Sequence, residues 1–226
     1  MKEENRKLEQ LHIKALLFDL DGTIIDTYEL ILASMRYALE NVLGQHYPDA
    51  QLMEKVGQPL LTQMYDYTDS DETVDELLRV YRHHNKIYEG ELAKSFPGTK
   101  EALEAMKRAG FPMGIVTSKM HGPALRGLQQ FELDEYFNFI IGSDDCERHK
   151  PHPEPVLYGA KLMNVDPRSC VYVGDSPFDI QSGNAAGTYT IAALWGMFSL
   201  ETLENEQPNA LCENIANLPT IIQSLK

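Results

Sequence analysis

The sequence predicts an α/β protein with a mostly parallel sheet and a small, wholly helical domain inserted after the first strand. Two observations lead to this fold class. Short apolar runs typical of buried strands alternate with segments of helical periodicity, as in parallel α/β folds. One long segment, residues 24–94, interrupts this alternation with helical periodicity alone. We therefore expect a core domain made of residues 1–23 and 95–226 and a helical domain made of residues 24–94.

Five apolar runs are predicted to form the strands of the core: residues 14–19, 112–117, 139–143, 170–174 and 189–194. Four other segments place apolar residues on one helical face: residues 99–110, 123–131, 154–163 and 177–186. The first of these helices is expected to begin at Thr99, a suitable N-cap, and to end at Gly110, a suitable C-cap. Because helices separate the later strands, we expect those strands to run parallel.

The interrupting segment contains two apolar stripes at helical spacing. One consists of Leu30, Ile31, Met35, Ala38, Leu39 and Val42, and the other of Val74, Leu77, Leu78, Tyr81 and Ile87. Charged residues fill the other positions, as expected for helices that bury one face. The chain is expected to pass between the two domains near residues 24–26 and 95–98, where Pro97 and Gly98 favour a turn.

The composition is that of an ordinary globular protein, with 226 residues, 43% of them apolar, and a formal net charge of −14. This charge argues against nucleic acid as a partner, because a phosphate backbone would be repelled. The cysteines Cys146, Cys170 and Cys212 are scattered and odd in number, which favours reduced thiols in an intracellular protein. The charged first seven residues have no apolar segment behind them, and no run is long enough to span a bilayer. We expect a cytoplasmic protein.

Two aspartates, Asp19 and Asp21, follow the first predicted strand and precede Gly22 and Thr23. Side chains two residues apart on a strand point to the same face, so the two carboxylates would share one side of the strand end. Like charges this close raise the free energy unless a cation or a shared proton relieves them. The pair therefore indicates a chemical role rather than a stabilising one.

Three more polar groups follow later strands: Thr-Ser-Lys at residues 117–119, Lys-Pro-His-Pro at 150–153 and Gly-Asp-Ser-Pro-Phe-Asp at 174–179. A turn or a helix cap would explain each group taken alone. In open α/β sheets, however, ligands bind in the crevice at the carboxyl ends of the strands. All four groups fall there, which predicts a single site at this edge of the sheet.

This order of motifs resembles that of the haloacid dehalogenase superfamily, in its magnesium-dependent phosphatase branch with a helical cap. The resemblance covers residues 14–218, and it implies a Rossmann-like core, a cap domain at residues 24–94 and Mg²⁺ as the cofactor. Residues 116–120, 150–156 and 193–196 are similar to the branch of phosphoglycolate phosphatases and inorganic pyrophosphatases.

The resemblance implies a phosphatase that hydrolyses a small phosphorylated metabolite, either a phosphoglycolate-like monoester or inorganic pyrophosphate, through an aspartyl-phosphate intermediate. Asp19 would be the nucleophile, and Asp21 the general acid and base. Two unit charges about 4 Å apart repel by about 4 kcal/mol at an effective dielectric of about 20, so carboxylate attack on phosphate needs opposing charge. Lys150 and a metal ion would supply that charge, and Thr117 would add a hydroxyl group.

Hard cations such as Mg²⁺ prefer oxygen ligands, which the acidic residues offer. The expected side-chain ligands are Asp19 and Asp175. The family pattern adds the main-chain carbonyl of Asp21, and Asp179 would act in the outer shell or through water. The expected phosphate-binding residues are Gly22, Thr23, Thr117, Ser118 and Lys150.

Substrate selectivity is expected to depend on the cap, and the residues chosen for it are Gly57 and Gln58 in the loop at residues 56–60. For Ser118 and Lys119, capping or solvent exposure explains the residue almost as well as a function does. Solvent-facing positions are expected for four histidines: His83, His84, His149 and His152.

Three alternative functions remain open. A sugar phosphomutase of the beta-phosphoglucomutase type uses the same residues, and a nucleotide or sugar-phosphate phosphatase lies closer still to the main interpretation. A phospho-aspartate receiver domain of a signalling system shares the α/β layout but is shorter and lacks the helical insert and the position of Asp21. The expected partner is a small phosphorylated metabolite, without nucleic acid or membrane, and the protein is expected to be a monomer or homodimer.

Overall fold

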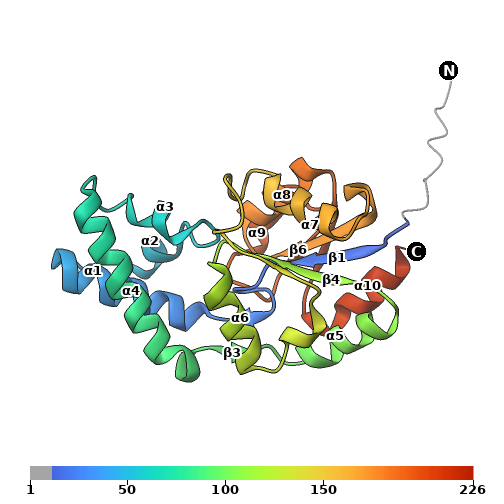
Figure 1. Cartoon of the computed structure of the whole chain (residues 1–226), viewed down its shortest axis with the longest axis horizontal. Coiled ribbons are helices and arrows are strands. Elements are labelled where there is room, and N and C mark those ends of the chain that lie inside the picture. Colours follow the sequence, from blue (N-terminus) through green and yellow to red (C-terminus); the bar gives the residue numbers. More distant parts are fainter. Residues whose placement is uncertain (1–11, 226) are drawn as a thin grey trace, which may run out of the picture.

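The computed structural model describes residues 12–225, so the charged first segment considered above lies outside the described residues. A parallel sheet with strand order β5-β4-β1-β6-β7-β8 forms the centre of the core (Figure 1). Its strands are β1 (Ala15–Phe18), β4 (Met113–Val116), β5 (Ile140–Ile141), β6 (Cys170–Gly174), β7 (Tyr189–Ala193) and β8 (Ala210–Cys212). The α/β class with a parallel sheet is thereby confirmed.

The five expected strands are present, with β5 reduced to two residues. The sequence interpretation missed β8, which pairs with β7 at the edge of the sheet through Ala193 and Cys212. Its three residues, Ala-Leu-Cys, are too few to show an alternation, and alanine has little preference for strands. Only pairing with a neighbour makes this segment a strand.

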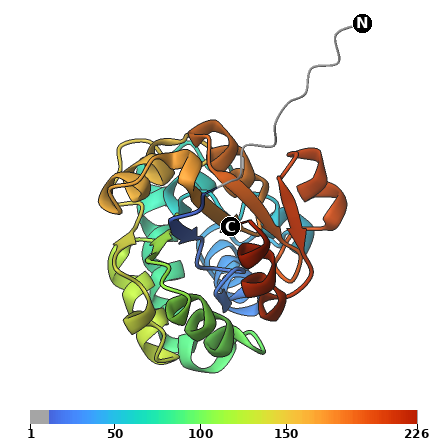
Figure 2. The same ribbon diagram turned by 90° about the vertical axis from the view of Figure 1, so that its right-hand side faces the viewer.

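Helices cover both faces of the sheet (Figure 2). Because successive strand residues alternate in direction, Leu16 and Phe18 pack on one face and Leu17 on the other. The first face is covered by α5 (Thr99–Arg108), α6 (His121–Gln130) and α10 (Leu218–Ser224). The second is covered by α7 (Glu154–Leu162) and α8 (Pro177–Ala186), and α9 (Leu200–Asn205) adjoins α8.

The start of α5 differs from the expectation. Gly98, with φ of 85°, occupies the N-cap position, and Thr99 is the first helical residue. The Thr99 hydroxyl donates to the carbonyl of Phe96 (2.9 Å), so it closes the preceding turn instead of capping the helix. At the other end Ala109 is the C-cap, and Gly110 follows it with φ of 85°, a conformation that glycine adopts without strain.

Between β1 and α5 lie four helices, which we call the helical insert: α1 (Tyr28–Leu43), α2 (Asp49–Met53), α3 (Leu60–Met64) and α4 (Asp71–Leu92). Figure 1 shows them together at one end of the molecule, to the left of the sheet. Their apolar faces form a cluster of buried residues of their own, centred on Met35, Leu39 and Leu77. The two stripes expected from the sequence supply most of this cluster.

A short antiparallel ribbon joins the helical insert to the core. Strand β2 (Ile25–Asp26) pairs with β3 (Lys94–Ser95) at the two positions where the chain leaves and re-enters the core. The sequence interpretation placed connections here but expected no strands, because two-residue strands show no periodicity. No helix among residues 12–225 combines the length and apolarity that a membrane span requires.

Candidate active site

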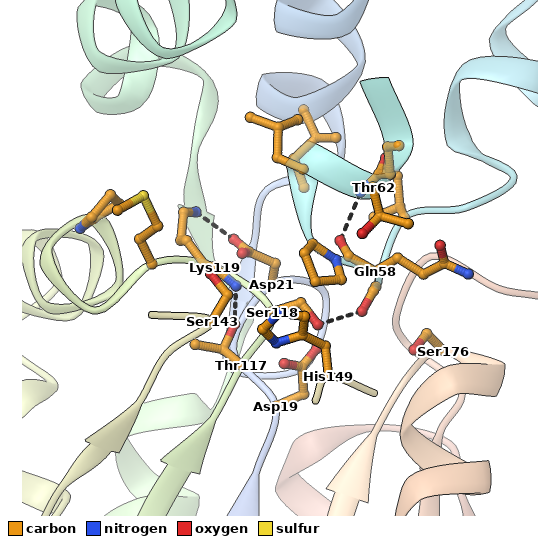
Figure 3. Close-up of a pocket in the computed structure, with 18 of the residues that line it drawn as sticks. Asp19, Asp21, Gln58, Thr62, Thr117, Ser118, Lys119, Ser143, His149 and Ser176 are labelled. Carbon is orange, nitrogen blue, oxygen red and sulfur yellow. Dashed lines mark hydrogen bonds and ion pairs between the residues drawn. The ribbon is translucent and has the colours of Figure 1, made fainter. Parts of the chain in front are cut away.

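Residues of the first, second and fourth polar groups line one cavity at the carboxyl edge of the sheet (Figure 3), and Lys150 of the third group contacts Asp19 there. Asp19 directly follows β1, and Asp175 directly follows β6. These strands are neighbours, with Phe18 opposite Val173. Since both strands run in the same direction, their ends deliver the two aspartates to the same place. The expectation that these groups lie together therefore agrees with the geometry.

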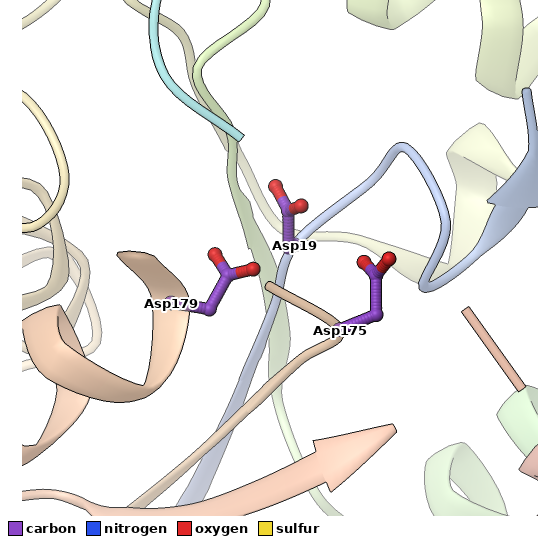
Figure 4. A group of neighbouring side chains, drawn as sticks. All are labelled: Asp19, Asp175 and Asp179. Atoms are coloured by element: carbon purple, nitrogen blue, oxygen red, sulfur yellow. The ribbon is translucent and has the colours of Figure 1, made fainter. Parts of the chain in front are cut away.

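Three carboxylates form the centre of the site. Asp19, Asp175 and Asp179 each offer one oxygen, and these oxygens lie within 4.8 Å of one another. In Figure 4 the three side chains project in the same general direction, with their carboxylates beside one another. The exposed fractions of the three residues are 4%, 1% and 0%, respectively. Such a cluster is costly without a cation, because each carboxylate has lost water and faces like charges.

A buried lysine lies between two of these carboxylates. The Lys150 ammonium is 2.8 Å from Asp19 Oδ1 and 2.5 Å from Asp179 Oδ1, and the residue is only 3% exposed. Burial lowers the pKa of Lys150, but the adjacent carboxylates of Asp179 and Asp19 raise it overall, so the ammonium keeps its charge. Lys150 thus holds a fixed positive charge beside the expected nucleophile.

Asp179 is held by more hydrogen bonds than its neighbours. Besides the ammonium of Lys150, it accepts from the Tyr172 hydroxyl (2.9 Å) and from the N–H (3.0 Å) and hydroxyl of Ser176. The exchange with Ser176 is a capping box at the start of α8. We expected an outer position for Asp179. The structure places one oxygen of Asp179 within 4.8 Å of an oxygen of Asp19 and of an oxygen of Asp175, so whether Asp179 would bind the metal directly or through water stays a prediction.

Asp175 is enclosed by two glycines. It accepts from the Thr23 hydroxyl (2.8 Å) and from the N–H of Met197 (2.8 Å). A Cβ at Gly22 would lie 2.2 Å from Asp175 Oδ2, and one at Gly196 would lie 2.1 Å from Asp175 Cβ. Only glycine fits at either position, and Gly22 also has φ of +83°.

Gly22 and Thr23, two of the residues expected to bind phosphate, belong to this environment of Asp175. The Thr23 hydroxyl donates to Asp175, and the N–H groups of Gly22 and Thr23 donate to the carbonyls of Ile25 and Leu20. Both residues therefore shape the loop that holds Asp175. Their direct contact with phosphate stays a prediction.

The surroundings raise the pKa values of two carboxyl groups, those of Asp19 and Asp175. Burial, followed by the charge of Asp179, raises the pKa of Asp19 to about 7, although Lys150 acts in the opposite direction. Burial also raises the pKa of Asp175 well above its usual range, and Asp179 and Asp19 contribute. A metal-free site therefore favours protonated carboxyl groups, and a bound cation would favour the ionised forms.

Asp21 lies apart from this cluster, at the floor of the cavity. Its Oδ1 accepts from the Lys119 ammonium (2.8 Å) and from the Thr27 hydroxyl (2.9 Å), and the Lys119 pair is drawn in Figure 3. For Lys119, the sequence interpretation considered capping or solvent exposure almost as good an explanation as a function. Its side chain is only 16% exposed. Its position two residues after Thr117 is a weak signal, because nothing in the sequence says that its ammonium reaches the first strand end.

The second motif connects the core with the helical insert. Thr117 lines the cavity, and its Oγ1 accepts from the N–H of Lys119 (3.2 Å). The Ser118 hydroxyl donates to the carbonyl of Gly57 (2.6 Å), which belongs to the loop before α3. Gly57 and Gln58, the residues chosen for selectivity, both line the cavity. Ser118 in this conformation contacts the insert rather than an open phosphate site.

The cavity between sheet and insert has a volume of about 360 Å³. Two of the four histidines expected in solvent behave otherwise. His149 is half-buried and lines the cavity, because the turn that places Lys150 also brings its neighbour inward. His84 is half-buried and stacks on the rings of Tyr37 and Tyr88. Tyr88 lies four residues after His84 on α4, a spacing that brings two side chains together, whereas Tyr37 lies on α1, so no local pattern indicates the contact with Tyr37.

The other two histidines lie nearer to the expectation. His83 is exposed, as expected. His152 is half-buried, and its Nδ1 accepts from the N–H of Glu154 (3.1 Å) at the start of α7. Cys146, Cys170 and Cys212 are free thiols, which agrees with the interpretation of the cysteines as reduced.

The arrangement of carboxylates around one lysine at the strand ends agrees with a family match. A model of the haloacid dehalogenase-like hydrolases matches residues 16–193. The chain belongs to this family. The match includes β1 with its two aspartates, the whole helical insert and the segment that carries Lys150, Asp175 and Asp179.

Relatives in this hydrolase family cover almost the whole chain. The pyrophosphatase PpaX of Bacillus pumilus is 34% identical over 210 residues, which are 93% of this chain and 96% of the relative. The crystal structure of a predicted phosphatase from Clostridium acetobutylicum is 28% identical with a TM-score of 0.84, covering 94% of this chain and 99% of that one. A beta-phosphoglucomutase from Clostridium difficile, 22% identical with a TM-score of 0.82 over 94% of this chain and 96% of that one, shares the fold.

The family match and the pyrophosphatase relatives confirm that the protein is an enzyme of the phosphatase class. The donor set also fits the metal that the family implies. Asp19, Asp175 and Asp179 supply carboxylate oxygens, the ligand type that Mg²⁺ prefers, and no nitrogen or sulfur ligand lies among them. The cluster could therefore hold a hard divalent cation, and it has little in common with a zinc site.

Proposed function

We propose that this phosphatase hydrolyses inorganic pyrophosphate, with phosphoglycolate-like monoesters as the next candidates, in a reaction that depends on Mg²⁺ and forms an aspartyl-phosphate on Asp19. The named activity of the PpaX relative supports the choice of pyrophosphate. The volume of the cavity, about 360 Å³, supports a small substrate, since it lies near the lower end of the range for ligand pockets.

The charge balance of the site carries the proposal. Asp19, Asp175 and Asp179 bear three negative charges when ionised, and Lys150 opposes them with one, which leaves two. A divalent cation balances these two charges. We infer that the carboxylates of Asp19 and Asp175 would hold Mg²⁺, that Asp179 would act directly or through water, and that the main-chain carbonyl of Asp21 would complete the protein ligands. When bound, the ion would supply positive charge to the phosphoryl oxygens and orient them.

Asp19 is placed to act as the nucleophile. Its Oδ1 is occupied by the Lys150 ammonium, whereas Oδ2 makes no hydrogen bond within residues 12–225, and the residue lines the cavity. In the first step, a bond forms between this oxygen and phosphorus while the bond from phosphorus to the leaving oxygen breaks. Thr117, which also lines the cavity, and Lys150 would donate hydrogen bonds to the phosphoryl oxygens.

Asp21 would move the protons. It donates a proton to the leaving oxygen in the first step and takes one from the attacking water in the second, when the aspartyl-phosphate is hydrolysed and Asp19 is regenerated. The hydrogen bonds from Lys119 and Thr27 hold one carboxylate oxygen of Asp21 and leave the other for this transfer. Lys119 is thus a positioning residue in the proposal.

We further propose that residues 24–94 act as a cap domain that moves relative to the core. The separate apolar cluster of the helical insert and the two-strand ribbon at its base support such a motion. Closure over the substrate would exclude water and complete the site. Gly57 and Gln58 would then approach the substrate from the cap.

The test is a phosphate-release assay on the purified full-length protein. Pyrophosphate, phosphoglycolate, sugar phosphates and nucleotides are compared at equal concentration, with Mg²⁺ and with excess EDTA. We expect the highest kcat/KM for pyrophosphate and no turnover in EDTA, restored by added Mg²⁺. Activity that survives EDTA would contradict the metal dependence. Release from sugar phosphates alone would overturn the substrate proposal, and conversion of one sugar phosphate into another without release would indicate a mutase.

A further inference from the structure

The longest helix of the insert, α4, brings polar groups to the same cavity. Tyr81 and Asn85 both line the cavity, and each is only 9% exposed. They are four residues apart and therefore share one face of the helix. The sequence places Tyr81 in an apolar stripe, which accounts for its ring but not for its hydroxyl. The two residues differ in what their polar atoms contact.

The Tyr81 hydroxyl makes no hydrogen bond with any of residues 12–225, whereas Asn85 donates to the hydroxyl of Ser34 on α1 (3.4 Å). Fully enclosed side-chain nitrogen and oxygen atoms all have partners in this part of the chain, so the Tyr81 hydroxyl opens to the cavity. A hydroxyl on a buried ring that lacks a protein partner is available to a ligand. Asn85 connects α4 to α1, and Tyr81 faces the cavity.

Two arginines also line the cavity: Arg82, which follows Tyr81 on α4, and Arg126 on α6. Both are exposed. Arg126 Nε is 3.8 Å from Glu89 Oε2 at the end of α4, and Arg82 forms no ion pair with any of residues 12–225. In a chain with net charge −14, two guanidinium groups that line one cavity offer positive charge to an anion.

Acidic groups also line the cavity. Asp19 and Asp175 lie in the central cluster, and Asp144 lies on the loop after β5. Asp21 is paired with Lys119. Burial, followed by the charge of Asp21, raises the pKa of the Tyr81 phenol, so Asp21 lies near the Tyr81 hydroxyl. The phosphoryl group to be transferred is bound at the strand ends beside Asp19. The rest of the substrate must then extend from the strand ends into the remaining space, which is bounded by α4 and α6.

We propose that Tyr81, Arg82 and Arg126 form a subsite for a second anionic group of the substrate, a phosphoryl or carboxylate group on the leaving side of the scissile bond. The inference rests on the proposed function and makes it more specific. The enzyme prefers small phosphorylated compounds that carry a further negative charge. Pyrophosphate and phosphoglycolate belong to this class, and phosphate monoesters with an uncharged leaving group do not. The guanidinium groups bind the anion, and the Tyr81 hydroxyl donates one hydrogen bond to it.

The test compares variants on two kinds of substrate. Tyr81→Phe, Arg82→Gln and Arg126→Gln are assayed in the full chain with pyrophosphate, phosphoglycolate and para-nitrophenyl phosphate, the last of which has no second anionic group. We expect each arginine variant to lower kcat/KM for the first two substrates by roughly tenfold to a hundredfold, mainly through KM, and Tyr81→Phe by roughly fivefold. Turnover of para-nitrophenyl phosphate should stay within about twofold.

Arg79→Gln is the matched control, because Arg79 is an arginine of the same helix that is not among the residues lining the cavity and is paired with Glu76 (2.7 Å from Nε to Oε2). Arg126→Lys keeps the charge and should recover part of the loss. An equal fall for all three substrates would overturn the subsite, because it would indicate a general effect on the site or on folding. Unchanged kinetics for both arginine variants would also overturn it.

A binding measurement separates this inference from the proposed function. In the Asp19→Asn background, calorimetric titration with pyrophosphate in the presence of Mg²⁺ reports binding without turnover. We expect Arg82→Gln and Arg126→Gln to raise Kd at least about tenfold there. If the wild-type protein released no phosphate while this binding still depended on the arginines, the subsite would stand and the proposed reaction would be wrong. Binding that ignores both arginines would overturn the subsite whatever the activity.

Discussion

The cavity has two walls: the strand ends, with Asp19 and Asp175, and the face of α4 that carries Tyr81. The two walls differ in how many hydrogen bonds the protein makes to their polar groups. At the strand ends, Asp179 accepts hydrogen bonds from Lys150, Tyr172 and Ser176, and Asp175 is enclosed on two sides. On α4, the hydroxyl of Tyr81 faces the cavity and has no hydrogen-bond partner among residues 12–225. A reacting group needs a fixed position, whereas a selective wall needs donors that are left for the ligand. We therefore propose that the reaction takes place at the strand ends of the sheet and that the helical insert contributes to selectivity.

The largest expected effect comes from removing the proposed nucleophile. Asp19→Asn should lower kcat for phosphate release by at least about 10⁴-fold, because an amide cannot form the aspartyl-phosphate. The unfolding temperature should fall little, since the change also removes one like charge from a buried cluster. Phosphate release and circular dichroism check both expectations, with the exposed Asp69→Asn as the control. Retained turnover in Asp19→Asn would show that the sheet wall does not carry the reaction as proposed.

Loss of the buried lysine tests how far the strand-end wall depends on internal charge balance. Lys150→Met leaves Asp19 and Asp179 without their cation, so the metal-free protein should lose about 3–5 kcal/mol in the free energy of unfolding. Activity should fall at least about a hundredfold. Denaturant titration measures the first effect. Lys161→Met, at an exposed position of α7, should change neither property. Equal stability of the two variants would mean that the charge of Lys150 is not needed to hold the cluster.

The dependence of stability on pH sharpens the same contrast. Burial and Asp179 raise the pKa of Asp19 to about 7 in the folded, metal-free protein, from about 4 in an unfolded chain. The folded state therefore holds a proton that the unfolded state releases, so stability is lost as pH rises from about 4 to 7. The free energy of unfolding of the metal-free protein should be roughly 2–4 kcal/mol lower at pH 8 than at pH 5, and the protein should therefore unfold at a lower temperature at pH 8.

Mg²⁺ should remove most of this difference, since it stabilises the ionised carboxylates at pH 8 and has less to bind at pH 5. Thermal unfolding at the two pH values, in EDTA and in Mg²⁺, measures the effect. Asp19→Asn, which lacks the titrating group, should show a weaker dependence on pH. A metal-free protein that is more stable at pH 8 than at pH 5 would contradict the strain assigned to the aspartate cluster.

The smallest expected effect concerns the contact between the two walls. Gly57 has φ of +104°, and a Cβ there would lie 2.7 Å from the hydroxyl of Ser176. Gly57→Ala should therefore push the loop of the insert away from the core and raise KM about threefold to tenfold, at a cost of about 1 kcal/mol in stability. Gly44→Ala is the control, because Gly44 also has a positive φ, of 68°, but no atom lies within 4 Å of the added Cβ. If KM rose equally in both variants, backbone strain and not the contact with the core would explain the rise. If KM rose in neither, the contact would not affect substrate binding.

The sequence by itself determined the elements that repeat a local pattern. Strands β1, β4, β6 and β7 are apolar runs, and α1 and α4 are amphipathic stripes, so each shows its buried face in its own residues. The order of the polar groups at the strand ends also predicted that Asp19, Thr117, Lys150 and Asp175 would meet, because a parallel sheet brings its strand ends to one edge.

Tertiary structure alone decided the contacts between segments far apart in the chain. Strand β8 and the β2–β3 ribbon exist through their pairing partners, and no periodicity marks them. The Lys119 ammonium reaches Asp21, 98 positions earlier, and the Tyr81 hydroxyl turns toward the cavity although its ring belongs to the apolar stripe. A side chain's partner depends on where the fold places other segments. Local sequence therefore indicated the polar groups at the strand ends. Only the packing of the insert on the sheet revealed that Tyr81 on α4 lines the same cavity.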